Sequence, residues 1–185
     1  MLNVNTYNLL TIENFSKFLN SLSCIKKNPT IAVAVSSGVD SMNLLHISDK
    51  WAKKNKKNLF IISYNHNLRK ESLKEIHYVK QASIKLGWKH KTLTWQNPAK
   101  KNILEKARIA RYQAISKFCK KQNISSILLG HHLDDMIETF CMRIIRNSRI
   151  DGKKPYFSRC RFRKRSQELY VIRIWIRVWN LEPWD

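Results

Sequence analysis

Residues 36–41 combine small side chains with one carboxylate, a combination suited to binding a phosphate group together with a cation. They read Ser-Ser-Gly-Val-Asp-Ser and follow the apolar run 31–35. Small residues let backbone N–H groups approach an anion, and a helix starting here would add unpaired N–H groups and a positive dipole. A carboxylate would repel phosphate, so Asp40 is interpreted as facing a divalent cation. A simple strand-to-helix turn, capped by Ser and Asp side chains, is the alternative.

A second group of titratable residues lies at 131–139, directly after another apolar run, and reads His-His-Leu-Asp-Asp-Met-Ile-Glu-Thr. Two imidazoles and three carboxylates at the end of a buried strand are costly to desolvate unless they bind cations or one another. Asp135 and Glu138 are three apart and share one face of a predicted helix, where they could hold an ammonium group or Mg²⁺. Helix capping by Asp134 and Asp135 is the alternative.

Three further residues, Arg108, Arg111 and His66, carry side chains able to contact phosphate. Arg108 and Arg111 are three apart in a predicted helix, so they project from one face and could clamp an anion. A solvated basic face is the alternative for this pair. His66 follows a further apolar run, where a histidine either faces the ligand or has a structural role.

The chain between these groups alternates between short apolar runs and amphipathic stretches. The runs predict strands at 31–35, 59–62, 90–95 and 126–130, and the stretches predict helices at 12–22, after the loop, at 72–86 and at 102–121. This alternation is typical of an α/β fold, here a Rossmann-like parallel sheet flanked by helices over about residues 1–150. Ligands of such sheets bind beyond the carboxyl ends of the strands, where the loop, His66 and the 131–139 segment all fall.

Composition favours a polyanionic partner. The formal net charge is +22 and the sequence pI is about 10.2, while a hydrophobic content of 43% is sufficient for a folded core. Aromatic residues among the lysines suit RNA better than a membrane surface, although a coding bias towards Lys and Asn is an alternative source of the charge. Four cysteines without a C-x-x-C pair indicate neither a zinc site nor a redox couple, and no apolar stretch is long enough to span a bilayer. We therefore expect a cytoplasmic protein with no membrane partner.

Four segments resemble one family in order and spacing: 36–41, 64–69 (Tyr-Asn-His-Asn-Leu-Arg), 107–112 (Ala-Arg-Ile-Ala-Arg-Tyr) and 131–138. Together they are similar to the tRNA(Ile)-lysidine synthases, which belong to the PP-loop N-type ATP pyrophosphatases. The resemblance covers about residues 12–152. It implies ATP-dependent adenylation of the wobble cytidine in the CAU anticodon of tRNA(Ile), followed by displacement of AMP by L-lysine. ATP and Mg²⁺ are the implied cofactors.

The resemblance also implies roles for single residues. The nucleotide is expected to contact Ser36, Ser37, Gly38, Val39, Asp40, Ser41 and His66. The expected catalytic residues are Asp40, Arg108, Arg111, His132, Asp135 and Glu138, with the arginines at the pyrophosphate and the last three holding and deprotonating the lysine. Mg²⁺ is expected at Asp40 and Asp134.

Ser37 departs from the family pattern, which has glycine at this position. If the position needs a positive φ or close contact with a phosphate oxygen, a side chain there costs about 1–2 kcal/mol in backbone strain. Serine is the least bulky polar residue after glycine. We therefore expect nucleotide binding that is weakened rather than abolished.

The resemblance ends near residue 152, where residue usage changes. Lysines outnumber arginines 20 to 6 up to residue 150, whereas residues 151–185 contain 3 lysines, 6 arginines and three of the six tryptophans. We therefore expect an incomplete PP-loop catalytic domain at 1–152 and an atypical basic, Trp-rich tail at 153–185, as a frameshift would produce, with apolar residues partly exposed. A genuine strand is the alternative for the tail, because residues 169–179 partly alternate.

Two functional alternatives stay open. One is an inactive, truncated remnant that only binds tRNA or ATP. The other is a PP-loop enzyme of tRNA thiolation, which the lack of a cysteine pair disfavours.

Overall fold

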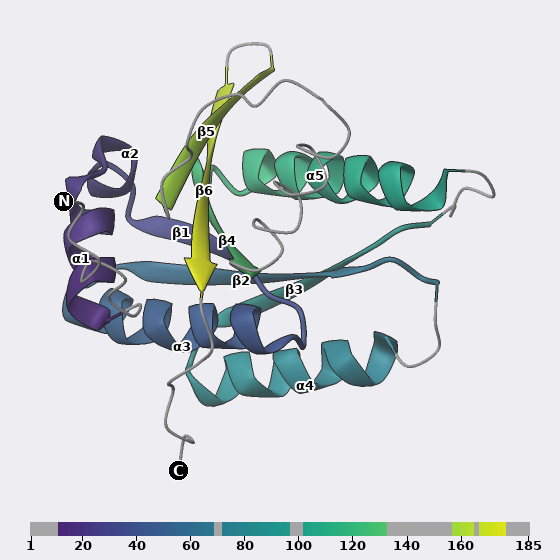
Figure 1. Ribbon diagram of the computed structural model, residues 1–185, viewed down its shortest axis with the longest axis horizontal. Coiled ribbons are helices and arrows are strands. Elements are labelled where there is room, and N and C mark those ends of the chain that lie inside the picture. Colours follow the sequence, from purple (N-terminus) through teal and green to yellow (C-terminus); the bar gives the residue numbers. More distant parts are fainter. Residues whose placement is uncertain (1–10, 69–71, 97–101, 133–156, 165–166, 177–185) are drawn as a thin grey trace, which may run out of the picture.

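The computed structural model describes residues 11–68, 72–96, 102–132, 157–164 and 167–176. These residues form a six-stranded sheet with helices on both faces (Figure 1). The α/β class predicted from alternating apolar runs and amphipathic stretches is therefore confirmed.

Five strands run parallel and one runs antiparallel at the edge. The parallel strands are β1 (Thr30–Ala34), β2 (Asn58–Asn65), β3 (Lys89–Thr94), β4 (Ser126–His132) and β6 (Gln167–Ile176), and β5 (Phe157–Lys164) pairs antiparallel with β6. The spatial order is β3-β2-β1-β4-β6-β5. The chain thus moves outward from β1 to β3 on one side and continues at β4 on the other. The segment that follows β1 lies at this reversal of strand order, where open α/β sheets bind ligands.

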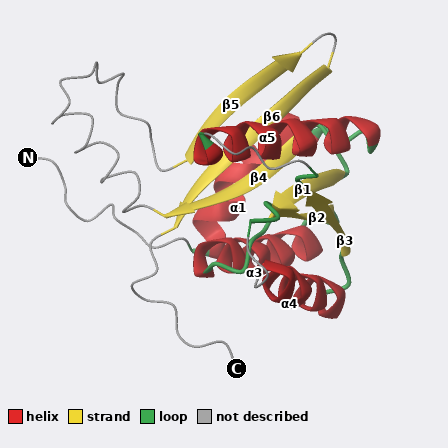
Figure 2. Ribbon diagram, turned by 90° about the vertical axis from the view of Figure 1, so that its right-hand side faces the viewer, coloured by secondary structure: helices red, strands yellow, loops and turns green. Residues whose placement is uncertain are grey.

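In the described part of the chain, five helices accompany the strands: α1 (Ile12–Ser21), α2 (Ser23–Lys26), α3 (Val39–Lys54), α4 (Ser72–Lys85) and α5 (Ile103–Lys121). Figure 2 shows α3 and α4 on one face of the sheet and α5 on the other. The Thr11 hydroxyl caps α1 by accepting from the Asn14 N–H at 3.2 Å. None of the described helices is long and apolar enough to cross a membrane.

The central strand β1 is buried on both faces, as the apolar run predicts. Val33 faces a core that includes Phe15 and Trp51, whose rings meet edge to face with centroids 6.4 Å apart. Ala32 faces a second core beneath α5, which includes Ile115. Both β1 residues are fully buried. Helices on each side therefore hold β1, and the loop that follows it, in a fixed place.

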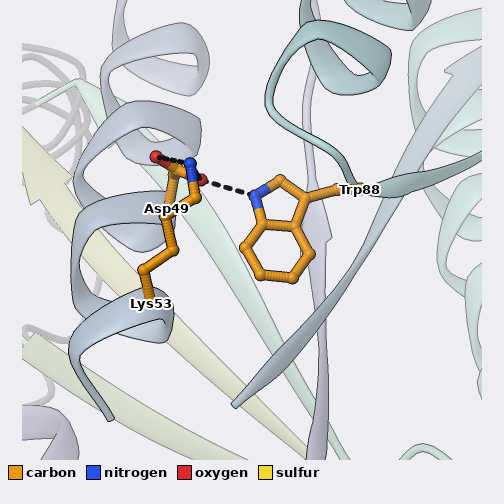
Figure 3. A network of polar contacts seen from close by, with 3 residues as sticks. All are labelled: Asp49, Lys53 and Trp88. Atoms are coloured by element: carbon orange, nitrogen blue, oxygen red, sulfur yellow. Dashed lines mark hydrogen bonds and ion pairs between the residues drawn. The ribbon is translucent and has the colours of Figure 1, made fainter. Parts of the chain in front are cut away.

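A polar network ties α3 to the turn that precedes β3 (Figure 3). Asp49 of α3 is 7% exposed, and its Oδ1 accepts from the indole Nε1 of Trp88 at 2.7 Å. The Nζ of Lys53 lies 2.9 Å from the same oxygen. The indole N–H thus gives the Asp49 carboxylate a hydrogen bond, without which its burial would cost free energy. This network fixes how α3 lies across the sheet, and α3 carries the candidate phosphate site at its N-terminus.

The segment after residue 152 contributes two strands to the same sheet. β6 pairs with β4 along seven residues, from Tyr170 opposite Ser126 to Ile176 opposite His132. Val171, Ile172 and Ile174 are at most 4% exposed and join the two cores. The structure therefore contains a genuine strand here, which was the alternative considered for the tail. The partial exposure expected for the apolar residues is not found at these three positions, because all three are buried. The sheet continues past the expected boundary at 152.

Replacing Ile172 by alanine tests this placement of β6. The side chain is fully buried, so Ile172→Ala is expected to lower the free energy of unfolding by about 2–5 kcal/mol. Ile84 of α4 is 55% exposed, and the matched Ile84→Ala variant is expected to change stability by less than about 0.5 kcal/mol. Urea denaturation measures both. Equal midpoints for Ile172→Ala and the parent chain would contradict the placement.

Candidate functional site

The loop between β1 and α3 is held closed by the hydroxyl of Ser41. This oxygen accepts from the Ser36 N–H at 3.1 Å and lies 2.8 Å from the Ser36 hydroxyl. Its own proton points towards the carbonyl oxygens of Ser36, at 2.7 Å, and Gly38, at 2.9 Å. Ser41 is 7% exposed, so these contacts are shielded from water. The hydroxyl of Ser41, expected to contact a nucleotide, is placed here to brace the loop.

Helix α3 begins directly after this loop without a side-chain cap. Gly38 is the N-cap residue, with φ −67° and ψ 147°, and it has no side chain to accept from the first turn. The first bond of the helix runs from the Met42 N–H to the Gly38 carbonyl at 3.0 Å. A helix N-terminus without a capping side chain presents N–H donors and a positive dipole to an anion. The start of α3 therefore offers the uncapped N–H donors that the predicted anion loop requires.

The backbone strain predicted at Ser37 is absent from the structure. Among the described non-glycine residues, positive φ occurs at Lys56, Asn67, Asn102 and Asn123, and Ser37 does not share it. The loop turns with Gly38 in extended backbone, so no left-handed residue is needed before the helix. Serine at position 37 consequently carries no penalty of this kind, and the expected weakening of binding loses its basis in backbone strain.

Gly130 of β4 sets how closely α3 approaches the sheet. A Cβ atom on Gly130 would lie 3.2 Å from the carbonyl oxygen of Asp40 and 3.3 Å from the Cα of Ser41. Both neighbours are backbone atoms of the first turn of α3, which cannot rotate away as a side chain could. Glycine therefore lets the helix N-terminus sit against β4. Sequence analysis missed this role, although a glycine ending the apolar run 126–130 was its signal.

Beyond the end of β2, the positive charge of Arg111 acts on His66. The rings of Tyr64 and His66 pack edge to face with centroids 4.9 Å apart, and the charge of Arg111 acts on both residues. The Nδ1 of His66 and the Nε of Arg111 are buried without a hydrogen-bond partner in the described part of the chain. An unsatisfied guanidinium N–H is a natural donor to an anionic oxygen.

This environment sets the charge of the imidazole. Burial lowers the pKa of His66 below its ordinary value, and the positive charge of Arg111 lowers it further. Burial also raises the pKa of Tyr64, an effect that Arg111 partly opposes. His66 is therefore neutral near pH 7, with one ring nitrogen as donor and the other as acceptor.

The two arginines predicted to act together flank one aromatic ring. The guanidinium carbons of Arg108 and Arg111 lie 5.7 Å and 5.4 Å from the centroid of the Tyr112 ring. Arg108 is exposed, whereas Arg111 is half-buried. The charge of Arg111 thus acts on His66. Arg108 lies three residues away along α5 and is exposed.

The other predicted residues are only partly within the described chain. His132 ends β4, where it pairs with Ile176. Asp134, Asp135 and Glu138 lie outside the described residues, so their roles stay predictions. Asp40 is half-buried in the first turn of α3, beside the loop. No group of three or more potential metal ligands occurs among the described residues.

These residues fit the phosphates of a nucleotide with Mg²⁺. The uncapped start of α3 and the buried Nε of Arg111 offer donors to phosphate oxygens. Asp40 offers the carboxylate that Mg²⁺ uses when it also binds substrate phosphates. Sequence reasoning had quoted Tyr64 and Tyr112 only as parts of motifs, and the structure shows that their rings pack against the predicted basic residues.

Comparison with known proteins finds a family and several relatives. The model of the PP-loop domain matches residues 8–182. The tRNA(Ile)-lysidine synthase of Rickettsia rickettsii (strain Sheila Smith) is 40% identical over 141 residues, which are 76% of this chain and 30% of the relative. That of Wolbachia pipientis wMel is 46% identical over 128 residues, covering 68% of this chain and 30% of the relative. The chain thus spans about a third of the length of the curated relatives it matches.

The fold is shared with solved structures, of which a tRNA thiolase is one. The U34-tRNA thiolase NcsA from Methanococcus maripaludis, determined with its [4Fe-4S] cluster, superposes with a TM-score of 0.63 and 17% sequence identity. The match covers 74% of this chain and 51% of the thiolase chain. At this identity the likeness concerns the fold alone.

The proximity of Arg111 to His66 can be tested by titration. Replacing Arg111 by glutamine removes a positive charge that repels the imidazolium, so the pKa of His66 is expected to rise. NMR titration of the histidine resonances measures this change. Arg108→Gln removes the same charge from an exposed position and is expected to leave the pKa of His66 where it is. An unchanged pKa in Arg111→Gln would show that the two side chains do not face each other.

Proposed function

Because this chain belongs to the PP-loop domain family, we propose that it binds ATP at residues 36–41 and uses it to modify tRNA. One observation carries the proposal: α3 starts at Gly38 without a capping side chain, beside a loop that Ser41 holds closed. Phosphate oxygens would satisfy the N–H groups of that first turn. The unpartnered Nε of Arg111, at the same edge of the sheet, supports a polyanionic ligand.

For the reaction, we propose lysidine formation on tRNA(Ile) with a CAU anticodon. The relatives at 40–46% identity bear the name tRNA(Ile)-lysidine synthase, and the net charge of +22 suits an RNA substrate. In the first step the C2 oxygen of the wobble cytidine attacks the α-phosphorus of ATP, and pyrophosphate leaves. In the second step the ε-amine of L-lysine attacks C2 and loses a proton. The C2–O bond then breaks and AMP leaves with the oxygen. A tRNA substrate implies action in the cytoplasm.

The residues divide between these two steps. Arg111, with Arg108 on the open side, would stabilise the negative charge of the leaving pyrophosphate. Asp40 and Asp134 would hold Mg²⁺, which supplies further positive charge to the phosphates when bound. His132, Asp135 and Glu138 would bind the lysine and take up its proton, since an ammonium group must become an amine before it attacks. His66, which is neutral near pH 7, would contact the nucleotide.

A non-catalytic role is the second candidate, and the charge of the chain favours it. A chain with a formal net charge of +22 can hold RNA through phosphate contacts alone. The chain spans about a third of the length of its relatives. Phosphate contacts alone hold RNA without orienting the anticodon, so such binding would not supply the positioning that the reaction needs.

The assay that separates these functions is release of AMP. A lysidine-forming ligase is expected to release AMP from ATP only when both L-lysine and tRNA(Ile) are present, and to increase the mass of the tRNA by one lysine residue. Asp40→Asn is expected to reduce the rate at least about a hundredfold, because a metal-side carboxylate is lost. Glu13→Gln removes one carboxylate from the first turn of α1 and is expected to have no effect on the rate.

Two outcomes would argue against the ligase. Binding of tRNA that weakens steeply with salt, without release of AMP, would favour the RNA-binding role. A product that depends on a sulfur donor instead of lysine would indicate thiolation.

A further inference from the structure

A buried hydroxyl links three strands directly beneath the phosphate loop. The Oγ of Ser63 in β2 donates to the carbonyl oxygen of Val35, the residue that ends the apolar run before the loop, at 3.0 Å. The Nε2 of His90 in β3 lies 3.0 Å from the same hydroxyl. Ser63 is 1% exposed, and His90 is half-buried. A continuous chain of hydrogen bonds therefore runs from the edge strand β3, through β2, to the end of β1.

The direction of these bonds follows from the number of protons. A serine hydroxyl has one proton, and that of Ser63 is directed to the Val35 carbonyl. The contact with His90 must then be made by a proton on Nε2. Burial lowers the pKa of His90, and the nearby charge of Lys80 lowers it further, so the ring is held neutral as the Nε2–H tautomer. His90 is thus a donor to Ser63.

The peptide unit held by Ser63 is the one that enters the loop. Its carbonyl, on Val35, accepts from Ser63, and its N–H, on Ser36, donates to the Ser41 hydroxyl at 3.1 Å. The Val35 N–H also donates to the Ile62 carbonyl at 2.9 Å. Two side-chain hydroxyls therefore fix both ends of one peptide plane. The orientation of that plane sets the direction in which the backbone leaves β1 and enters the loop at residues 36–38.

We propose that His90 is a positioning residue for the phosphate loop, because it orients the Ser63 hydroxyl that fixes the Val35–Ser36 peptide. The inference rests on the proposed binding of ATP phosphates at residues 36–41. It adds a residue from β3 that none of the motifs at the site includes. If position 90 only had to fill space between the strands, an apolar side chain would serve and would avoid the cost of desolvating an imidazole.

Variants at both ends of the bond test the proposal. His90→Leu removes the donor and is expected to weaken binding of ATP with Mg²⁺ about five- to tenfold in calorimetry. His90→Gln keeps an N–H donor at similar reach and is expected to restore affinity to within about twofold of the parent chain. Ser63→Ala is expected to weaken binding about as much as His90→Leu. The double variant should bind no more weakly than Ser63→Ala, since both changes break one chain of bonds.

Matched controls separate positioning from general destabilisation. His77 is an exposed histidine of α4, and Ser83 is a buried serine that bonds within α4. His77→Leu and Ser83→Ala are expected to leave ATP affinity unchanged. If the parent chain binds ATP and His90→Leu binds it equally well, or if His90→Gln fails to restore a lost affinity, the proposal is wrong.

A second measurement judges the proposal independently of ATP binding. The exchange rate of the Ser36 amide proton, measured without nucleotide, is expected to rise about fivefold or more in His90→Leu and to stay unchanged in His77→Leu. Absence of ATP binding in the parent chain would count against the proposed function. In that case an unchanged Ser36 exchange rate would still overturn the positioning role, and a raised rate would support it.

Discussion

The contact between the first turn of α3 and Gly130 of β4 is the constraint on which the site depends. A helix can point its N-terminal N–H groups at a ligand beyond the sheet only if its first turn lies close to the strand ends. Here a side chain at position 130 would meet backbone atoms of Asp40 and Ser41 at 3.2–3.3 Å. The absence of that side chain, together with the closed loop at Ser41, defines the position of the proposed anion site. The other groups are placed relative to it.

The electrostatics of the site follow from this arrangement. The N-terminus of α3 and the guanidinium of Arg111 both favour negative charge, and burial makes the unsatisfied Nε of Arg111 expensive to leave unpaired. Burial lowers the pKa of His66 and the charge of Arg111 lowers it further, so the imidazole adds a hydrogen-bonding group without adding further charge. The carboxylate of Asp40 opposes this field unless a cation accompanies the anion. A nucleotide with Mg²⁺ meets all of these requirements at once.

Sequence patterns predicted the parts of the fold that local periodicity determines. The apolar runs before Ser36, Ser63 and Gly130 became parallel strands, and the amphipathic stretches became the helices that cover them. The strain at Ser37 was inferred from the residue that other PP-loops carry, but φ at that position depends on how Gly38 and Ser41 shape the turn.

The altered residue usage after 152 obscured β6. Its Val171 and Ile172 nevertheless pack on opposite faces of the sheet, as residues of any central strand do. The contacts of Gly130 with α3, and of His90 with Ser63, join residues far apart in the chain, so spacing alone could not reveal them.

Binding of inorganic pyrophosphate with Mg²⁺, followed by NMR at each backbone amide, tests the central claim most directly. If the N-terminus of α3 is the anion site, the amide resonances of residues 36–41 will shift with saturation. Those of Lys57 and Asn58, near the start of β2 at the opposite edge of the sheet, will stay in place. Saturable shifts centred on other amides, with none at residues 36–41, would contradict the account.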